Sequence, residues 1–471
     1  MIAEMAKDKA GAEKRCEEAY EKARQLQSKL NDVITFVDPK EQLEHLPEEG
    51  KMRGVPIALK DNVNTKGILT TAGSRILSSY VPIYDAEIVT RLKAAGAVCI
   101  AKASMDELAM GGTNLTCFTG PAHNPWDTRR MTGGSSGGSA ALVSSGVVPM
   151  AIGSDTGDSI RKPAAFNGIV GDKPTYGRSS RYGSIPYSSS LDHVGYFTRS
   201  IEDACLSLEV LAGRDDRDMT SSNRPVEEYT KNLNSDMHGM KIAVIANVID
   251  NVSNPETVKI FNQRMEELKA RGAQVDIYQF DENLMKAILP TYFIIANCEA
   301  TSNHSNLDGI RFGVREDGAD MKEIMTNSRT RGFGPLIRRR FVIGSYGLFE
   351  ENQERLFRKA QKVRRLIVEA MDDCLKEYDA IVAPASGDIA PLIDEKKDQD
   401  QLSDDYLIAE NYMAMGNFSG YPSMTVPMGF YDGCPLGMNI TCRAWEEETM
   451  FNIGKAMEEI TGYKDLHAEV K

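Results

Sequence analysis

The sequence contains few histidines, almost no tryptophan and no long run of apolar residues. Its 471 residues include six histidines and two tryptophans. No apolar run reaches the length needed to cross a bilayer, so we expect no part of the chain in a membrane. Residues 1–26 are charged throughout and contain no apolar secretory segment. We therefore expect a cytoplasmic location.

Paired cysteine motifs are also absent, although the chain has eight cysteines. They are scattered at Cys16, Cys99, Cys117, Cys205, Cys298, Cys374, Cys434 and Cys442, without a C-x-x-C pair. In a chain of this length, that distribution argues against a disulfide framework or a zinc site and predicts free thiols in a reducing compartment. We expect no metal or other cofactor in this chain.

Positive charge is in deficit, because the formal net charge is −13. The electrostatic field of a protein with this net negative charge repels nucleic acid. Any RNA partner would therefore be held mainly by another protein of the same complex.

Apolar residues make up 41% of the composition, and they are arranged as alternating strands and helices. This alternation predicts an α/β layered fold, and we expect one large mixed domain instead of separate modules. Residues 12–30 predict an amphipathic surface helix, and 241–278 predict a strand–helix–strand crossover with its helix at 255–270. The other predicted strands are 55–59, 97–102, 380–384, 423–429 and 437–442, and the other predicted helices are 85–96, 201–211, 348–377 and 446–460.

Three further segments carry weaker local signals. Residues 104–111 predict a helix that begins at Ser104, with Glu107 completing a capping box. Residues 214–236 turn polar and predict an exposed connection. Residues 394–405 are strongly acidic and predict a mobile loop.

Glycine and serine are concentrated between Met131 and Gly171, in the middle of the chain. Glycine lets backbone amides approach a ligand closely, and serine hydroxyls supply nucleophiles and proton relays. The segment 140–153 is too apolar and regular for a flexible linker. We interpret the stretch as a binding loop or a catalytic centre.

Three chemistries compete for this stretch. A phosphate-binding loop is excluded because no lysine follows the glycines at the required place. Residues 134–138 fit the pattern G-x-S-x-G of a nucleophile elbow, which requires a histidine base. Among the six histidines, His193 and His304 stand in polar surroundings downstream, without a distinguishing context.

The third chemistry is a serine hydrolase that uses lysine as its base. Lys60 would follow the strand 55–59, Ser135 would relay the proton, and Ser159 would be the nucleophile. An ordinary lysine, with a pKa of about 10.4, holds its proton at neutral pH, but burial disfavours the charged form. A glycine-containing turn could direct the amides of Thr156, Gly157, Asp158 and Ser159 toward one oxyanion. The alternative for Lys60 is that its charge simply marks where the chain leaves the core.

Three stretches resemble the signature of the amidase-signature hydrolases. They read GVPIALKDN, TGGSSGGSAA and GSDTGDSIRKPAAFNG, and they place Lys60, Ser135 and Ser159 at the family's spacing. The resemblance covers nearly the whole chain. It implies a single large α/β/α domain over residues 1–471 with a twisted mixed sheet: an N-terminal helical and linker segment 1–50, a catalytic core 51–213 and a remainder 237–471. It also implies a cis peptide between Gly134 and Ser135.

Four more stretches resemble one branch of that family, the A subunits of aspartyl/glutamyl-tRNA amidotransferases. They begin at Lys173, Glu299, Arg338 and Asn352. The resemblance implies hydrolysis of glutamine, with the ammonia passed to a partner that amidates a mischarged tRNA. It also implies B-type and C-type partner subunits, with ATP and Mg²⁺ on the partner.

The same resemblance suggests which residues bind the substrate. Arg340 would bind the α-carboxylate of glutamine, since a guanidinium suits a carboxylate well. Tyr292 would form a wall of the pocket, and Glu410 would hold the ammonium. At least one or two of Arg338, Arg339 and Arg340 would belong to a solvated basic face.

The sequence departs from the family pattern at three positions: Asp158 stands in place of glycine, Asn167 in place of a small or sulfur-containing residue, and Asp172 in place of an apolar one. At position 158, a side chain would clash if the backbone required a positive φ, and a carboxylate would oppose an oxyanion. Two alternatives to the glutaminase therefore stay open: a free-standing amidase that acts on another small amide, and a weakened or inert scaffold protein of the same complex.

Overall fold

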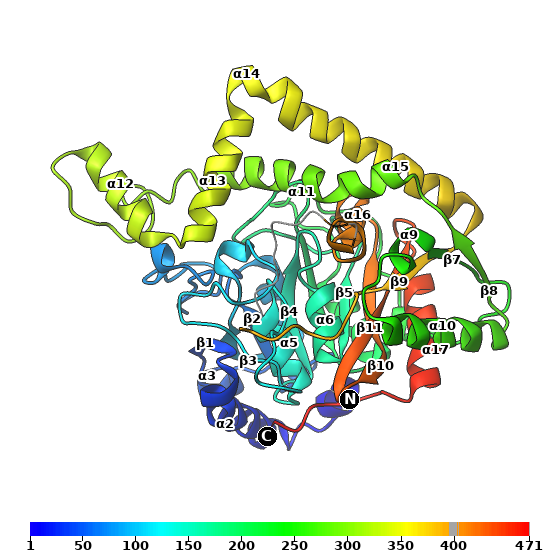
Figure 1. Cartoon of the computed structure of the whole chain (residues 1–471). Coiled ribbons are helices and arrows are strands. Elements are labelled where there is room, and N and C mark those ends of the chain that lie inside the picture. Colours follow the sequence, from blue (N-terminus) through cyan, green and yellow to red (C-terminus); the bar gives the residue numbers. More distant parts are fainter. Residues whose placement is uncertain (395–402, 404, 471) are drawn as a thin grey trace.

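The alternating strands and helices assemble into one twisted mixed sheet (Figure 1). A computed structural model describes residues 1–394, 403 and 405–470. Within these residues the sheet has 11 strands in the order β1-β3-β2-β4-β6-β5-β10-β11-β9-β7-β8. The strands are β1 (Val33–Phe36), β2 (Val55–Lys60), β3 (Ala97–Ala103), β4 (Met150–Asp155), β5 (Val170–Lys173), β6 (His193–Thr198), β7 (Lys241–Ile245), β8 (Gln274–Tyr278), β9 (Ala380–Pro384), β10 (Ser423–Tyr431) and β11 (Cys434–Cys442).

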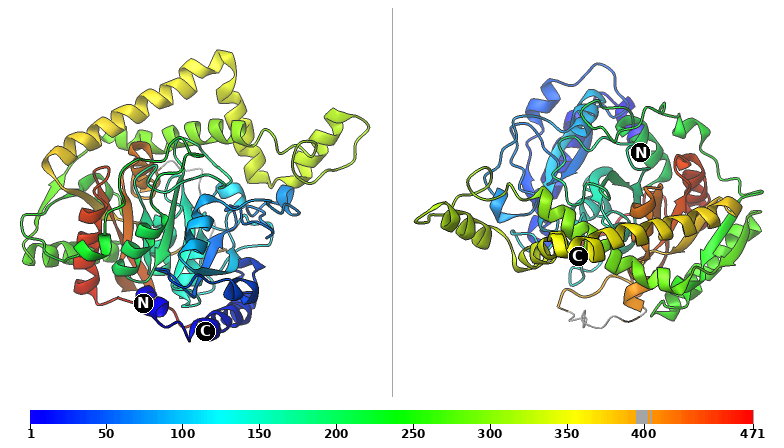
Figure 2. Two further views of the ribbon diagram at one scale, coloured as in Figure 1. Left: turned by 180° about the vertical axis from the view of Figure 1, so that it is seen from behind. Right: turned by 90° about the horizontal axis from the view of Figure 1, so that it is seen from above.

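Helices cover both faces of this sheet. The helices are α1 (Ile2–Lys7), α2 (Ala12–Leu30), α3 (Lys40–Glu44), α4 (Glu87–Ala94), α5 (Gly137–Ser144), α6 (Arg161–Asn167), α7 (Ile201–Leu211), α8 (Tyr229–Asn232), α9 (Ala246–Ile249), α10 (Pro255–Ala270), α11 (Glu282–Asn303), α12 (Met321–Gly332), α13 (Pro335–Leu348), α14 (Glu350–Gln353), α15 (Lys359–Glu377), α16 (Met415–Ser419) and α17 (Glu447–Thr461). In Figure 1, α11 and α15 cross the top of the sheet, and α12 projects to one side. The view from above in Figure 2 shows α15 running over the body of the molecule.

The core is divided by the sheet, because successive side chains of a strand point to opposite faces. On β7, Ile242 and Val244 join one buried cluster, which includes residues of α7, α10 and α17. Ala243 and Ile245 join another cluster, with residues of α11 and α15. The fold is therefore the predicted α/β/α arrangement.

Many predicted elements are confirmed with little or no change in their ends. Helices α2, α7 and α10 and strand β9 have the predicted bounds, and β7 and β8 pair in parallel across the predicted crossover. All eight cysteines are free, as predicted, and all eight are buried. No helix among the described residues is both long enough and apolar enough to cross a membrane.

The predicted helix at 104–111 is wrong. Only a short 3-10 turn forms, over Glu107–Ala109, and Leu108 and Ala109 have φ of 52° and 59°. The carboxylate of Glu107 accepts hydrogen bonds from Ser74 and from the amide of Gly334 instead of closing a capping box. Tertiary partners therefore override the local capping signal at this site.

Other predicted segments need smaller corrections. The long helix predicted over 348–377 is broken into α14, a π-turn at Glu354–Arg358 and α15. The connection 214–236 is not fully exposed, because Asp215, Ser221 and Tyr229 are buried. The predicted mobile loop falls largely on residues 395–402 and 404, which lie outside the described residues.

Candidate active site

Lys60 lies at the carboxyl end of β2, between the parallel strands β3 and β4. Its side chain is fully buried. The ammonium nitrogen donates to Ser135 Oγ at 2.8 Å, Ser136 Oγ at 2.8 Å and Ser154 Oγ at 2.9 Å. Burial lowers the pKa of Lys60 to about 7, while the carboxylates of Asp106, Asp155 and Asp192 oppose this fall. The lysine can therefore act as a base near neutral pH.

The segment 133–137 brings the serines to Lys60. The peptide between Gly134 and Ser135 is cis. A Cβ on Gly134 would lie only 1.9 Å from Asp106 Oδ2, so only glycine fits at this position. The amide of Asp106 also donates to the carbonyl of Ser135. Asp106 thus holds Ser135 by this hydrogen bond and leaves no room for a side chain at Gly134.

Ser159 lies in the turn between β4 and α6, next to the segment 133–137. Its carbonyl accepts a hydrogen bond from the amide of Ser136 at 3.2 Å. Its hydroxyl makes no hydrogen bond to another described residue, Ser135 included. The structure therefore joins Lys60 and Ser135 directly and brings Ser159 to them through the backbone.

The turn before Ser159 presents unpaired backbone donors. Within the described chain, the amides of Thr156, Gly157, Asp158 and Ser159 have no hydrogen-bond acceptor. Such donors suit a developing oxyanion. The oxyanion role of these four residues stays a prediction.

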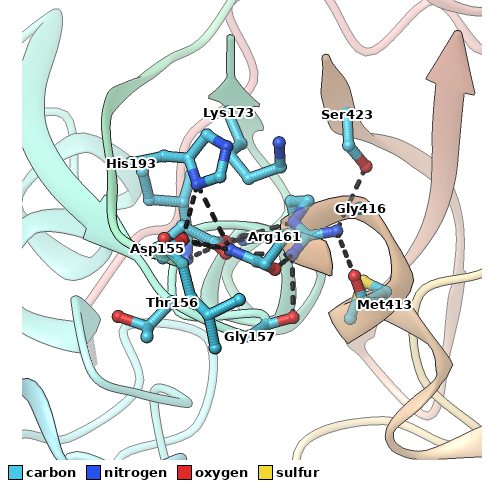
Figure 3. Close-up of polar contacts among 12 residues, drawn as sticks. Asp155, Thr156, Gly157, Arg161, Lys173, His193, Met413, Gly416 and Ser423 are labelled. Atoms are coloured by element: carbon cyan, nitrogen blue, oxygen red, sulfur yellow. Dashed lines mark hydrogen bonds and ion pairs between the residues drawn. The ribbon is translucent and has the colours of Figure 1, made fainter. Parts of the chain in front are cut away.

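Arg161 anchors this turn from behind (Figure 3). Its guanidinium pairs with Asp155 at 2.9 Å and donates to the carbonyl of Gly157 at 2.8 Å. It also donates to the carbonyl of Met413 and to Ser423 on the far side. Both members of the ion pair are fully buried. These contacts orient the Gly157–Asp158 peptide.

Aromatic residues of α11 form one wall beside the turn. A Cβ on Gly157 would lie 3.0 Å from the ring of Tyr292, so this tyrosine packs directly against the turn. Arg340, on α13, donates to the hydroxyl of Tyr187 at 2.6 Å and lies over the ring of Phe293. Arg340 is half-buried, whereas Arg338 and Arg339 are exposed. The structure thus separates Arg340 from the two arginines that form a solvated face.

Glu410 already has partners in this structure. Its carboxylate pairs with Lys162 at 2.7 Å and accepts a hydrogen bond from the amide of Gly387 at 2.9 Å. Lys162 is buried and also donates to the Glu410 carbonyl. The signal for Lys162 was weak, because a lysine in a helix predicts only a surface charge.

The residues that depart from the family pattern have different surroundings. Asp158 is half-buried, and its φ is not positive, so its backbone does not require glycine. Asn167 donates to the carbonyls of Thr132 and Pro163, and Asp172 accepts from the hydroxyl of Tyr196. Of the three, only Asp158 lies in the turn that carries Ser159.

The histidines do not support a nucleophile elbow. Ser136, at the centre of that pattern, hydrogen-bonds to Lys60 and donates to the carbonyl of Ser154. His193 contacts the carbonyl of Leu191, and His304 packs against Phe341. Neither ring contacts Ser136. Among the described residues, no cluster of histidine, cysteine or carboxylate side chains could hold a metal ion.

Two residues next to the lysine were not singled out from the sequence. Ser154, at the end of β4, hydrogen-bonds to Lys60 and to Asn62. A cavity of about 260 Å³ is lined by Ser154 and Asn62, and also by Tyr187, Asp192 and Thr220. The available signal was topological, because the carboxyl ends of neighbouring parallel strands meet at one edge of a sheet.

Known proteins are similar to this chain in both sequence and fold. The family model described as Amidase matches residues 15–451. The chain belongs to the amidase family. This amidase is 40% identical to the A subunit of the glutamyl-tRNA(Gln) amidotransferase of Lactobacillus acidophilus, over 96% of this chain and 94% of the relative. It is also 40% identical to the protein of that name from Sulfolobus acidocaldarius, over 96% of each chain.

Solved structures give the same result. The crystal structure of the A subunit of glutamyl-tRNA(Gln) amidotransferase from Thermotoga maritima has a TM-score of 0.84 with this amidase at 34% identity, covering 100% of this chain and 98% of that one. A peptide amidase from Stenotrophomonas maltophilia also has a TM-score of 0.84, at 28% identity, with coverage of 99% and 98%. The fold is therefore the amidase-signature fold.

Proposed function

We propose that this amidase hydrolyses the side-chain amide of glutamine and supplies the ammonia that converts Glu-tRNA(Gln) or Asp-tRNA(Asn) to its amidated form. The observation that carries the proposal is the hydrogen bond from buried Lys60 to Ser135, beside the turn of Ser159. The relatives named as A subunits of glutamyl-tRNA(Gln) amidotransferases support the choice of substrate.

The chemistry would run through Ser159, Ser135 and Lys60. Ser159 Oγ attacks the amide carbon while Ser135 Oγ takes its proton and gives its own to neutral Lys60. Amides of the turn stabilise the oxyanion. The proton then returns to the leaving nitrogen, ammonia departs, and an acyl-enzyme forms on Ser159. Water attacks this ester by the same route and releases glutamate.

Substrate recognition would use the two faces of the pocket. Arg340 binds the α-carboxylate and Tyr292 forms the wall, while the resemblance assigns the α-ammonium to Glu410. B-type and C-type subunits would complete the cytoplasmic enzyme. The tRNA, ATP and Mg²⁺ would be held mainly by the partner, consistent with the net charge of −13 on this chain.

A glutaminase assay with and without the partner subunits tests this function. Lys60→Ala removes the base, and we expect kcat/KM to fall by about 10²–10⁴-fold, the usual contribution of general base catalysis. Ser159→Ala removes the nucleophile and abolishes acylation. Wild-type turnover in either variant would show that the mechanism is wrong.

Ser135 and Ser136 provide a matched pair, because both hydroxyls lie 2.8 Å from Lys60 Nζ. Ser135→Ala removes the proposed relay, and we expect about a 10²-fold or larger loss in kcat. Ser136→Ala removes a hydrogen bond to the same lysine and is the control, with a smaller loss. A larger loss of kcat in Ser136→Ala than in Ser135→Ala would assign the relay to Ser136.

Two other functions are distinguished by simple measurements. A free-standing amidase is favoured by the similarity to the peptide amidase, and it would be purified as a lone monomer with broad amide hydrolysis. An inert scaffold is suggested by Asp158. It would leave Ser159 unlabelled by a serine-reactive acyl probe until Asp158 is changed to glycine.

A further inference from the structure

The loop 187–192 contacts two parts of the proposed site that are far apart in the sequence. At its first residue, the hydroxyl of Tyr187 accepts a hydrogen bond from Arg340 at 2.6 Å. At its last residue, the carboxylate of Asp192 accepts one from the hydroxyl of Thr156 at 2.7 Å. Thr156 begins the turn 156–159, which carries the proposed oxyanion amides. One short loop therefore bonds to the proposed oxyanion turn and to the arginine expected to bind the substrate carboxylate.

The carboxylate of Asp192 also closes this loop on itself. Asp192 Oδ2 accepts a hydrogen bond from the amide of Tyr187 at 2.8 Å, and each carboxylate oxygen lies 3.0 Å from the amide nitrogen of Ser188. The amide of Asp192 donates to the carbonyl of Ser188 at 2.8 Å. Hydrogen bonds to an ionised group are roughly twice as strong as neutral ones. The carboxylate therefore fixes the position of Tyr187 relative to Thr156.

Tyr292 forms a second connection between the same two parts. A Cβ on Gly157 would lie 3.0 Å from the ring of Tyr292. The ring of Tyr292 meets that of Tyr187 edge to face, with 6.5 Å between their centroids. Tyr187 is buried, and buried side chains pack densely. The turn and Arg340 are thus held at a set separation by two routes that meet at Tyr187.

Two long helices hold the loop from outside. On α11, Glu299 Oε2 accepts hydrogen bonds from the hydroxyl of Ser188 at 2.5 Å and from the amide of Ser190 at 2.9 Å. On α15, Arg364 donates to the hydroxyl of Ser190 at 3.0 Å and to its carbonyl at 3.2 Å. Supporting contacts of this kind fix the geometry of a site before a substrate binds.

We propose that Asp192 is a positioning residue that sets the distance between the oxyanion turn and Arg340, and so selects amides by the length of chain between their carboxylate and their scissile amide. Glutamine would place its amide carbon in the turn while its carboxylate reaches Arg340. Asparagine is one methylene group shorter and would reach only one of the two. The inference rests on the proposed glutaminase function and names the residue that would reject shorter amides.

The ratio of kcat/KM for glutamine to kcat/KM for asparagine measures this selection. The full chain, with its partner subunits, is assayed at about pH 8.5, where Lys60 is mostly neutral, because Asp192 also acts on the pKa of Lys60. We expect a wild-type ratio of about 10² or more, the usual cost of misplacing reacting groups by an ångström.

Two variants break the link between the loop and the turn. Thr156→Val removes only the hydroxyl that bonds to Asp192, and the ratio should fall about tenfold, as expected for a hydrogen bond to a charged group. The fall should come from a lower kcat for glutamine, because the turn acts on the transition state. Asp192→Asn should lower the ratio at least as much. The double variant should lose no more than the larger single loss, because both changes remove the same contact.

Tyr187→Phe tests the other end of the loop. It removes the hydroxyl that bonds to Arg340 and keeps the ring that contacts Tyr292. We expect KM for glutamine to rise about tenfold with little change in kcat. A purely structural role of the loop would not divide the effects between KM and kcat in this way.

Asp308→Asn is the matched control for a loss of stability. Asp308 is also a buried carboxylate that accepts hydrogen bonds from two backbone amides, those of Ile310 at 2.9 Å and Arg311 at 2.8 Å. Its partners among the described residues do not include the turn or Arg340. We therefore expect the wild-type ratio in this variant.

The inference is overturned if Thr156→Val keeps the wild-type ratio, whether or not Asp192→Asn folds. It is also overturned if Asp308→Asn lowers the ratio equally, if the losses add in the double variant, or if Tyr187→Phe lowers kcat and leaves KM unchanged. Equal hydrolysis of glutamine and asparagine by the wild-type protein would overturn the inference and leave the proposed function standing. Hydrolysis of neither amide would overturn both.

Discussion

Lys60 shows how burial turns an ordinary side chain into a reactive one. Its ammonium nitrogen has only serine hydroxyls and a carbonyl as hydrogen-bond partners among the described residues. No carboxylate forms an ion pair with it there. Desolvation therefore outweighs the more distant carboxylates and lowers the pKa to about 7. The base and its relay are fixed before any substrate arrives.

This pKa predicts the acidic limb of the pH profile. Lysine must be neutral to accept a proton, so glutaminase kcat/KM should rise as the pH increases through about 7 and level off above it. Steady-state assays between pH 5.5 and 9 would measure this limb. Asp158→Asn is the control, because the limb should stay with Lys60. A shift in the apparent pKa of the acidic limb in the Asp158→Asn variant would contradict the assignment of this limb to Lys60.

The turn between β4 and α6 is an element whose shape depends on one buried ion pair. Arg161 on α6 reaches back to Asp155 at the end of β4 and to the carbonyl of Gly157. Removing one member of such a pair leaves an uncompensated buried charge. The turn therefore needs both partners to stay in place.

Arg161→Met should lower the free energy of unfolding by about 3–5 kcal/mol. Denaturation in urea, followed by circular dichroism, would measure the loss. Arg129→Met is the matched control, since Arg129 pairs with Asp127 but is 79% exposed. Its effect should be within about 1 kcal/mol. Similar losses of unfolding free energy in both variants would contradict the attribution of the effect to burial of the ion pair.

Local signals predicted the ends of several elements well. Helix α10 begins at a proline behind an asparagine cap, and its periodicity is unbroken. The failure at residues 104–111 has a physical cause, because Glu107 is recruited by Ser74 and by Gly334, which is 227 residues away. A capping pattern cannot reveal a competing partner at that distance in sequence.

At the scale of the whole molecule, the sheet carries the core. Ile440, in the interior strand β11, is fully buried, whereas Ile277, on the edge strand β8, is 71% exposed. Ile440→Ala should cost about 2–5 kcal/mol of stability through lost burial and a residual cavity. Ile277→Ala should change stability by about 0.5 kcal/mol or less. Urea midpoints for the two variants would test this contrast, and equal midpoints would contradict it.

The sequence by itself determined the α/β alternation, the free state of the cysteines and the spacing of Lys60, Ser135 and Ser159. These features are local or motif-based, so they can be identified before the chain is folded. Only the tertiary structure brought Ser154 and Ser136 within hydrogen-bond distance of Lys60. It also paired Lys162 with Glu410, which is 248 residues away in sequence. Such pairings follow from strand order and helix packing, which bring distant side chains into a low-dielectric interior where each charge must find a partner.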